Sequence, residues 1–276
     1  MSKLGAVASA LWRPAILILL SLITLYPIWF ILQTALKTSP GYAVNPTGLP
    51  AHVTFGNFVS VVRDLPVPRW MLNSILVTIA SVGAATIVGY FAAYGMVFGR
   101  PRGASALLNA NLAFMAIPPV VLLVPMFTLM VQIGLINTLP SVMLFYAGLN
   151  VPFSIFFLVN FLREIPGDLI EAAQIDGASP LRALIQVVLP LSAPAVTTLV
   201  LVNSIWVWNE LLIALVFLQN DSSRTLMAGL TTFQGRYSNN EPLIMAGVFV
   251  SILPLIITYI AGQRFFIRGL TVGMGK

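Results

Sequence analysis

Residues 165–190 read IPGDLIEAAQIDGASPLRALIQVVLP, a comparatively polar stretch between long apolar runs. The order of its helix-forming and turn residues predicts two short helices that meet at an angle. Asp168 is placed to cap the first helix, which we expect to extend to about Asp176. Gly177 is predicted to end that helix, because glycine readily adopts the left-handed backbone conformation that often follows a helix.

The second helix of this stretch has boundary signals of its own. Ser179 is placed as its N-cap, and Pro180 suits the first helical position, where a missing N–H group costs nothing. Pro190 is predicted to end it. The surrounding segment, residues 163–192, contains Glu164, Asp168, Glu171 and Asp176, which are four of the eight acidic residues in the chain. We therefore expect this segment to meet a partner with a basic surface.

The composition of the whole chain indicates an integral membrane protein. Of its 276 residues, 58% are hydrophobic and 8% are charged, and the mean hydropathy is +0.95. A soluble surface of this size needs many more charges, which excludes a cytosolic enzyme. The net charge of +6 is not arranged in basic runs, which excludes nucleic acid as a partner. With no cysteine and one histidine, His52, the usual thiolate and imidazole metal sites are excluded as well.

Hydropathy predicts an all-α fold with six transmembrane helices, organised as a single transmembrane domain over residues 1–276. The predicted spans cover residues 15–36, 71–98, 107–133, 139–162, 194–218 and 243–262, and residues 163–192 form a loop between the fourth and fifth. Pro118, Pro119 and Pro125 fall inside the third span, so we expect that helix to be kinked or broken. Such a break either acts as a hinge or lines a path, or it belongs to a bent packing helix.

Small side chains recur every four residues in the second span, at Ser81, Ala85, Gly89 and Ala93. A stripe of this kind lets another helix approach closely, so helix packing is favoured over a substrate groove. Just before the same span, Trp70 is interpreted as an anchor at a membrane–water interface.

The distribution of lysine and arginine predicts the orientation. Six spans put both termini on one side, and nine of the fourteen basic residues lie on that side. They are Lys3, Arg13, Arg100, Arg102, Arg163, Arg182, Arg264, Arg268 and Lys276, against Lys37, Arg63, Arg69, Arg224 and Arg236 on the other side. The positive-inside rule therefore predicts cytoplasmic N and C termini and a cytoplasmic loop at residues 163–192.

The order of residues in this loop is similar to a known family pattern. Glu171-Ala172-Ala173, three residues, Gly177, nine residues and then Val187-x-Leu189-Pro190 resembles the EAA loop of the inner-membrane permeases of binding-protein-dependent ABC importers. The family pattern has isoleucine at the position of Val187, a conservative departure. The stretches that are similar to the sugar-importer branch, and to the smaller maltose-type permease, are Asn73-Ser74, Trp208-Asn209-Glu210, Ala246-Gly247 and residues 269–276.

The resemblance implies a transport subunit rather than an enzyme, in the plasma (inner) membrane of a bacterium or archaeon. Its implied partners are a second permease subunit, two copies of an ATPase subunit that bind ATP and Mg, and an extracytoplasmic binding protein. The docking residues that it implies for the ATPase are Glu171, Ala172, Ala173, Asp176 and Gly177.

The chain itself is expected to hold no cofactor, because it lacks a Gly-x4-Gly-Lys-Ser/Thr phosphate loop. By the same resemblance, tail residues Gly273 and Lys276 are implied contacts to the ATPase subunit, with a frayed terminus as the alternative.

One acidic residue lies well inside a predicted span. Glu210 is a candidate functional residue because exposing a carboxylate to lipid is costly. On a continuous helix Asn203, Trp206 and Glu210 share one face, with Asn209 at its edge. Amides, a carboxylate and an indole suit a sugar, whose hydroxyls need donors and acceptors and whose ring faces stack on aromatic side chains. The alternative is a structural Glu210, either neutral or paired with the partner permease.

Tyr146 and Asn150, in the fourth span, are further candidates for a substrate path. The expected function is ATP-driven import of a mono-, di- or oligosaccharide, with a phosphorylated polyol such as glycerol phosphate as an alternative cargo. From a different class, a self-sufficient proton-coupled transporter or an intramembrane enzyme would use Glu210 as its titrating group. An enzyme normally needs a second buried titratable group, and no predicted span offers one.

Overall fold

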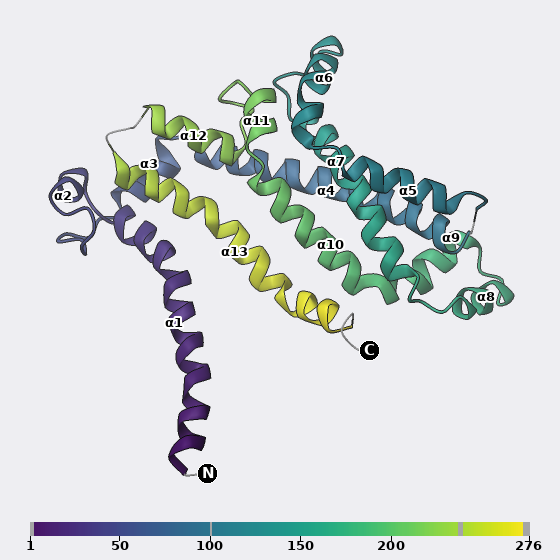
Figure 1. Ribbon diagram of the computed structural model, residues 1–276. Coiled ribbons are helices and arrows are strands. Elements are labelled where there is room, and N and C mark those ends of the chain that lie inside the picture. Colours follow the sequence, from purple (N-terminus) through teal and green to yellow (C-terminus); the bar gives the residue numbers. More distant parts are fainter. Residues whose placement is uncertain (1–2, 100, 237–239, 273–276) are drawn as a thin grey trace. The chain divides into compact units, whose positions relative to one another are not determined.

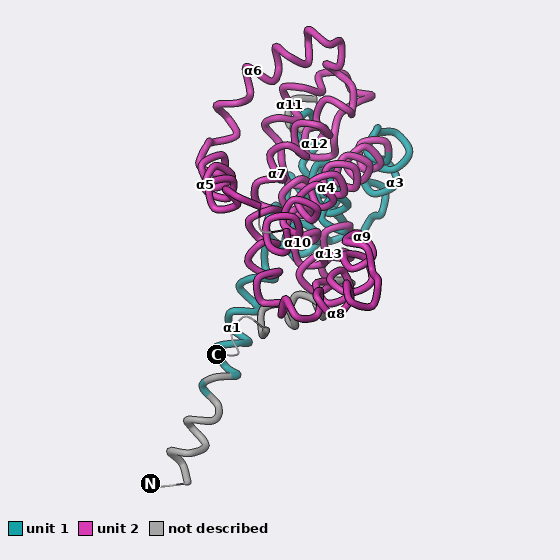
Figure 2. The backbone as a smooth tube through the Cα atoms, turned by 90° about the vertical axis from the view of Figure 1, so that its right-hand side faces the viewer, with its two compact units in different colours: residues 1–68, 230–253 teal, residues 69–229, 254–276 magenta. Residues whose placement is uncertain are grey.

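The computed structural model describes the backbone of residues 3–99, 101–236 and 240–272, and all regular structure in those ranges is helical (Figure 1). The chain forms two compact units, residues 1–68 with 230–253 and residues 69–229 with 254–276 (Figure 2). In chain order the elements are α1 (Lys3–Ala35), α2 (Ser39–Val44), α3 (Gly56–Arg63), α4 (Val67–Val97), α5 (Ala104–Met115), α6 (Pro119–Gln132), α7 (Leu139–Leu162), α8 (Asp168–Ile175), α9 (Pro180–Ala183), the π-helical turn η1 (Leu184–Val188), α10 (Leu189–Asn209), α11 (Leu212–Phe217), α12 (Leu226–Arg236) and α13 (Glu241–Val272).

The predicted all-helical membrane fold is confirmed. Five helical runs in the described ranges are long and apolar enough to cross a membrane: Pro14–Ala35, Val67–Val97, Leu139–Leu162, Pro180–Asn209 and Glu241–Ile260. Helices α5 and α6 qualify together as a sixth span, although they are bent by 90° at the break between them. The break at Pro118 confirms that the third span is interrupted, as its prolines predict. The cytoplasmic orientation of the termini stays a prediction.

The helix that contains most of the predicted fifth span, residues 194–218, begins and ends earlier than that range. The helical run from Pro180 passes through η1 into α10 and ends at Asn209, and α11 is a separate short helix. Pro190 therefore does not end the second helix of the loop. The Leu189 N–H bonds to the carbonyl of Leu184, five residues back, and Pro190 falls in the first turn of α10. The wide π turn thus accommodates a residue that has no N–H group.

Helix α7 is the element of the second unit that packs against α5, α6, α10 and α11. The stripe of small residues on α4 also meets α7. The Ser81 hydroxyl donates to the carbonyl of Met143 at 3.2 Å, and a Cβ atom at Gly89 would lie 2.6 Å from the Cβ of Ser154. Since Ala85 and Ala93 are fully buried as well, the helix-packing interpretation of this stripe is confirmed.

Trp70 is buried rather than placed at a membrane interface, so that interpretation is wrong. Its side chain is 1% exposed, and its indole N–H donates to the carbonyl of Asp221 at 2.7 Å. The ring packs on Gly229, where a Cβ atom would lie 2.1 Å from the indole. The segment after α11 therefore folds back over the start of α4.

In the first unit, the segment after α1 is held together by the buried Lys37. Its Nζ donates to the carbonyls of Asn45 and Pro46, both at 2.9 Å, and lies 5.8 Å from the centre of the Tyr42 ring. The Asn57 amide donates to the carbonyl of Lys37 at 2.8 Å. Desolvation lowers the pKa of the Lys37 ammonium, and the two carbonyls compensate for part of its lost hydration.

Candidate functional site

The loop between α7 and α10 forms the predicted pair of angled helices, α8 and α9. Gly177 separates them with a φ of +83°, which confirms the predicted left-handed helix end. The Ser179 hydroxyl accepts a hydrogen bond from the N–H of Arg182 at 3.3 Å, which confirms its capping role. Asp168 is not the cap of α8, because Gly167 occupies that position and Asp168 is the first helical residue. Its carboxylate still lies in the first turn, where the helix dipole favours negative charge.

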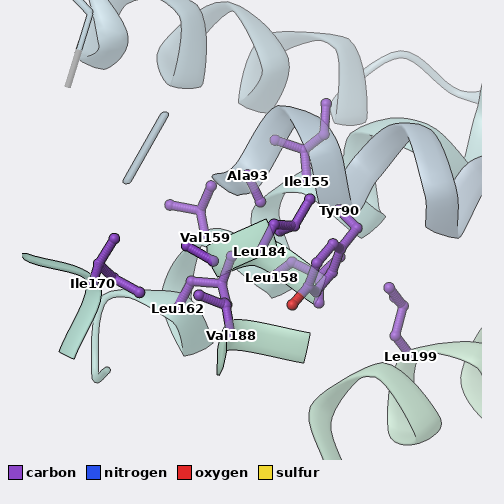
Figure 3. Close-up of a cluster of buried hydrophobic side chains, with 11 residues drawn as sticks. Tyr90, Ala93, Ile155, Leu158, Val159, Leu162, Ile170, Leu184, Val188 and Leu199 are labelled. Carbon is purple, nitrogen blue, oxygen red and sulfur yellow. The ribbon is translucent and has the colours of Figure 1, made fainter. Parts of the chain in front are cut away.

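A buried apolar cluster fixes this loop to the membrane helices (Figure 3). Ile170 reaches it from α8, Leu184 and Val188 reach it from η1, and they meet residues of α4, α7 and α10. The contributions from those helices are Tyr90, Ala93, Ile155, Leu158, Val159, Leu162 and Leu199. The Tyr90 hydroxyl adds a hydrogen bond to Ser192 at 2.7 Å. The loop is thus packed as part of the second unit.

The residues that the resemblance implies as docking contacts lie mainly on the outer face of this loop. Glu171, Ala172, Asp176 and Gly177 are exposed, whereas Ala173 is half-buried and packs against the apolar cluster. Ile175 is 86% exposed on the same short helix, which sequence reasoning missed. Its signal is its position four residues after Glu171, on the same helix face. An exposed isoleucine beside two carboxylates suits a partner surface that is partly apolar and partly basic.

A cavity of about 820 Å³ lies between the α5–α6 break and helices α7 and α10. Most of its lining consists of Phe, Leu, Met, Val, Ile and Pro side chains. Its polar residues are Asn111, Asn150, Asn203 and Trp206, and no charged residue is among the lining residues in the described part of the chain. Three of these four are sequence-predicted path residues. Sequence reasoning missed Asn111, whose only signal is an amide in a largely apolar span that also contains Asn109.

The three cavity amides bond to the protein through their N–H groups. Asn111 donates to the carbonyl of Pro152 at 2.9 Å, and Asn150 donates to the carbonyl of Tyr146 at 2.7 Å. Asn203 donates to the Ser154 hydroxyl at 3.1 Å, and that hydroxyl donates to the carbonyl of Asn150 at 2.7 Å. The network ties α5 and α10 to α7. All three amides are at least nine-tenths buried.

Glu210 is the C-cap residue at which α10 ends, and it does not line the cavity with Asn203 and Trp206. Helix α10 ends at Asn209, and Glu210 has an extended backbone with ψ 125°. Its carboxylate accepts hydrogen bonds from the N–H groups of Ile213 and Ala214, at 3.0 and 3.2 Å, and from the Tyr146 hydroxyl. The carboxylate therefore caps the first turn of α11 and does not line the cavity.

Tyr146 links Glu210 to the cavity wall. Its side chain is 1% exposed, and its ring meets the Trp206 ring edge to face, with 5.9 Å between centroids. Trp206 is 39% exposed and lines the cavity. Asn209 does not line it, and its amide donates to the carbonyl of Ile205 at 2.7 Å. The predicted tail contacts, Gly273 and Lys276, lie outside the described residues.

Comparisons with known proteins agree with this architecture. The family model described as "Binding-protein-dependent transport system inner membrane component" matches residues 85–272. The chain is 38% identical to the "Putative ABC transporter permease protein ORF2" of Caldicellulosiruptor sp. (strain Rt8B.4), over 96% of each chain. It is 30% identical to the "Melibiose/raffinose/stachyose import permease protein MelC" of Bacillus subtilis (strain 168), over 91% of each.

A solved structure is similar over nearly the whole length of this chain. It is titled "Crystal structure of a bacterial ABC transporter involved in the import of the acidic polysaccharide alginate". The TM-score is 0.81 at 25% sequence identity, and the match covers 96% of this chain and 99% of the other. With the family match across more than half of its residues, this chain belongs to the inner membrane components of binding-protein-dependent transport systems.

Proposed function

We propose that this chain is one permease subunit of an ATP-driven importer that moves a sugar delivered by an extracytoplasmic binding protein. Membership of the family supports the importer role, and the names of the relatives support the sugar, since they refer to melibiose, raffinose, stachyose and alginate. The partners are a second permease subunit and two ATPase subunits that bind ATP and Mg. The chain itself needs no cofactor for this role.

The observation that carries this proposal is the cavity at the α5–α6 break. A break of 90° in a span leaves backbone groups without helical partners, and such breaks are tolerated where they line a cavity or pack against protein. Here the cavity brings an indole and three amides together in an apolar wall. The indole offers a face for a pyranose ring, and the amides offer hydrogen bonds to hydroxyl groups. The cavity is thus suited to form part of a sugar path.

The exposed face of α8 is the proposed contact for the ATPase subunit. Glu171, Ala172, Asp176 and Gly177 form this face, and Ile175 extends it. Because Ile170 and Leu184 anchor the loop in the same apolar cluster as α4 and α7, a displacement of the loop displaces those helices as well. ATP binding and hydrolysis in the partner would then drive alternating access by rigid-body motion.

The test is uptake by the complete complex in proteoliposomes, with its ATPase, partner permease and binding protein. We expect uptake of neutral sugars that requires ATP and is unaffected by collapse of the proton gradient. Transport that needs the proton gradient and no ATP would overturn the proposal. If the complex transports only compounds without sugar rings, the assignment of a sugar as cargo is wrong, whereas the importer role is retained.

A charge reversal on the α8 face tests the coupling role. We expect Glu171→Lys to lower uptake by more than tenfold, because it opposes a basic partner surface, while membrane insertion stays normal. Glu164→Lys is the matched control, since Glu164 is exposed on the same loop but precedes α8. Equal uptake by the two variants would refute the docking role of Glu171.

The two alternatives have less support from the site. A phosphorylated polyol needs cationic or N–H-rich contacts, and the described cavity lining has no lysine, arginine or histidine. A proton-coupled transporter would use Glu210, but its carboxylate is engaged by three donors within the chain. We expect Glu210→Gln to keep ATP-dependent uptake within about threefold, because glutamine retains an acceptor oxygen for this network.

A further inference from the structure

We propose that the cavity selects uncharged, hydroxyl-rich ligands through the amide oxygens of Asn111, Asn150 and Asn203. The inference rests on the proposed function and narrows its substrate class. Neutral sugars or polyols would be accepted, whereas sugar phosphates and uronic acids would be rejected at this subunit.

The chemistry of the bonding partners fixes the orientation of each amide. A backbone carbonyl only accepts, so the N–H groups of Asn111 and Asn150 must face Pro152 and Tyr146. The Ser154 hydroxyl donates its one proton to the carbonyl of Asn150, so it accepts a hydrogen bond from the amide of Asn203. Rotating the amide of Asn111 or Asn150 to exchange its oxygen and nitrogen loses its hydrogen bond, and rotating the amide of Asn203 loses the bond from Ser154 to Asn150.

The three amide oxygens are therefore left over as acceptors. Within the described residues, none of them accepts a hydrogen bond. None is among the side-chain atoms that are fully buried without a partner, so each keeps some accessible surface. The residues are 8%, 6% and 2% exposed and line the cavity, which makes the cavity the place where a ligand hydroxyl can reach them. A sugar hydroxyl satisfies such an oxygen by donating its proton.

The cavity offers an anion few groups that could replace its lost hydration. Transfer of a carboxylate or phosphate from water is unfavourable unless a cation or several donors replace its hydration. The described lining has no cation, and the amide oxygens carry partial negative charge. At the start of α6, Pro118 and Pro119 have no N–H groups and the N–H of Val121 is bonded to the carbonyl of Pro118, so fewer donors remain there for an anion than at most helix starts.

The apolar remainder of the lining completes the selectivity for a sugar-like ligand. Trp206 is held by the Tyr146 ring and presents a partly exposed indole to the cavity. Pyranose rings have apolar C–H faces and polar edges, which match an indole combined with a few acceptors. The alginate named for the similar solved importer is acidic, so we expect this chain to differ from that importer in cargo charge.

A reporter thiol gives a direct test in the complete complex. The chain has no cysteine, and a Cβ atom added at Gly148, which lines the cavity, meets no other atom within 4 Å. The rate of alkylation of Gly148→Cys by N-ethylmaleimide is measured in nanodiscs without binding protein, and the modified peptide of this chain is quantified. Gly95→Cys is the matched control, because it has the same free space outside the cavity.

Matched ligand pairs decide the outcome: trehalose with trehalose 6-phosphate, galactose with galacturonate, and glycerol with glycerol 3-phosphate. We expect at least one neutral member to slow alkylation at position 148 at a tenfold lower concentration than its anionic partner, with no effect at position 95. Equal or better protection by the anion overturns the inference. A complex that imports sugar while no ligand protects position 148 also overturns it and leaves the proposed function intact. If the complex shows no ATP-dependent sugar uptake, the proposed function itself is wrong, and this result is distinct from the outcomes above.

A pair of asparagines on α7 tests the amide oxygens themselves. Asn150 and Asn160 each donate to the carbonyl four residues earlier, but only Asn150 lines the cavity. We expect Asn150→Leu to raise the half-protecting concentration of the neutral sugar three- to tenfold, the effect of one lost hydrogen bond. Asn160→Leu should leave it unchanged. If the two variants behave alike, the amide at position 150 has no part in selection.

Discussion

The α8–α9 loop and the cavity contrast in how their shapes are determined. Neighbouring residues shape the loop, since Gly177, Ser179 and Pro180 end one helix and begin the next. The cavity depends on helices that are distant in sequence, because Asn111 and Asn203 come from α5 and α10 and meet the protein through α7. We therefore expect changes in the loop to affect coupling more strongly than their cost in stability alone would. Changes around the cavity should alter stability and selectivity.

The largest effect is expected where α4 meets α7 behind the cavity network. A Cβ atom at Gly89 would lie 2.6 Å from the Ser154 Cβ and 3.2 Å from its backbone carbon, so Gly89→Val must push the helices apart. We expect a loss of about 3 kcal/mol in stability, seen as a lower midpoint in thermal unfolding of the detergent-purified protein. Gly83→Val on the same helix meets no atom within 4 Å with its Cβ and serves as the control. Similar midpoints for both variants would contradict close packing at Gly89.

In the loop, a change at Gly177 should affect uptake more strongly than stability. This residue and Gly134 have positive φ angles, +83° and +72°, and neither would place a Cβ atom near another group. Replacing either by aspartate costs about 1–2 kcal/mol of backbone strain. We expect Gly177→Asp alone to lower coupled uptake about tenfold, measured in proteoliposomes together with ATP hydrolysis. A parallel loss in Gly134→Asp would mean that backbone strain, rather than docking, controls uptake.

The hydrogen bond between Tyr146 and Glu210 lies next to the cavity, and its contribution to stability can be measured. We expect Tyr146→Phe and Glu210→Ala each to lower stability by about 1.5 kcal/mol or more, since the bond involves a carboxylate. In the double variant the losses should not add, because both remove the same bond. The measurement is a double-mutant cycle by thermal unfolding, with the exposed Tyr259→Phe as control. Full additivity would show that the two residues act separately.

The smallest effect is expected at Tyr90, where the loop cluster and the membrane helices meet. Tyr90→Phe keeps the ring in the apolar cluster and removes the hydroxyl bond to Ser192. We expect a loss of about 1 kcal/mol in stability and uptake within about twofold of the wild type. Ser192 keeps its bond to the carbonyl of Val188, so Ser192→Ala should add a further loss. A change in uptake much larger than the change in stability would make Tyr90 part of the coupling route.

The contrast between the two regions also explains what could be predicted from the sequence. The loop was predicted nearly residue by residue because caps, prolines and glycines act locally. Its errors are local too: α8 is capped one residue earlier than Asp168, and Pro190 sits inside a helical run. Nothing in the sequence indicates the π turn that admits Pro190, so the helix was expected to end there although the helical run continues through it.

The cavity was predicted only in part. Asn203, Trp206 and Asn150 were identified because polar and aromatic residues stand out in apolar spans, and these three line it. Helix periodicity grouped Glu210 with Asn203 and Trp206, but α10 ends at Asn209 and the Glu210 carboxylate bonds to the start of α11 and to Tyr146. Ser154 was missed because a serine in a span has no distinctive pattern, and its role depends on Asn203, which approaches from another helix.

The uninterrupted run from Pro180 to Asn209 has a mechanical consequence. Its α10 part comprises 21 residues, so it forms an arm of about 32 Å with the π turn at one end and Trp206 near the other. A tilt of about 10° at the loop end displaces the far end by roughly 5 Å. The π turn near the loop is the most compliant part of the run. The stiffness of the π turn therefore determines how much of a movement at the loop is transmitted to the cavity.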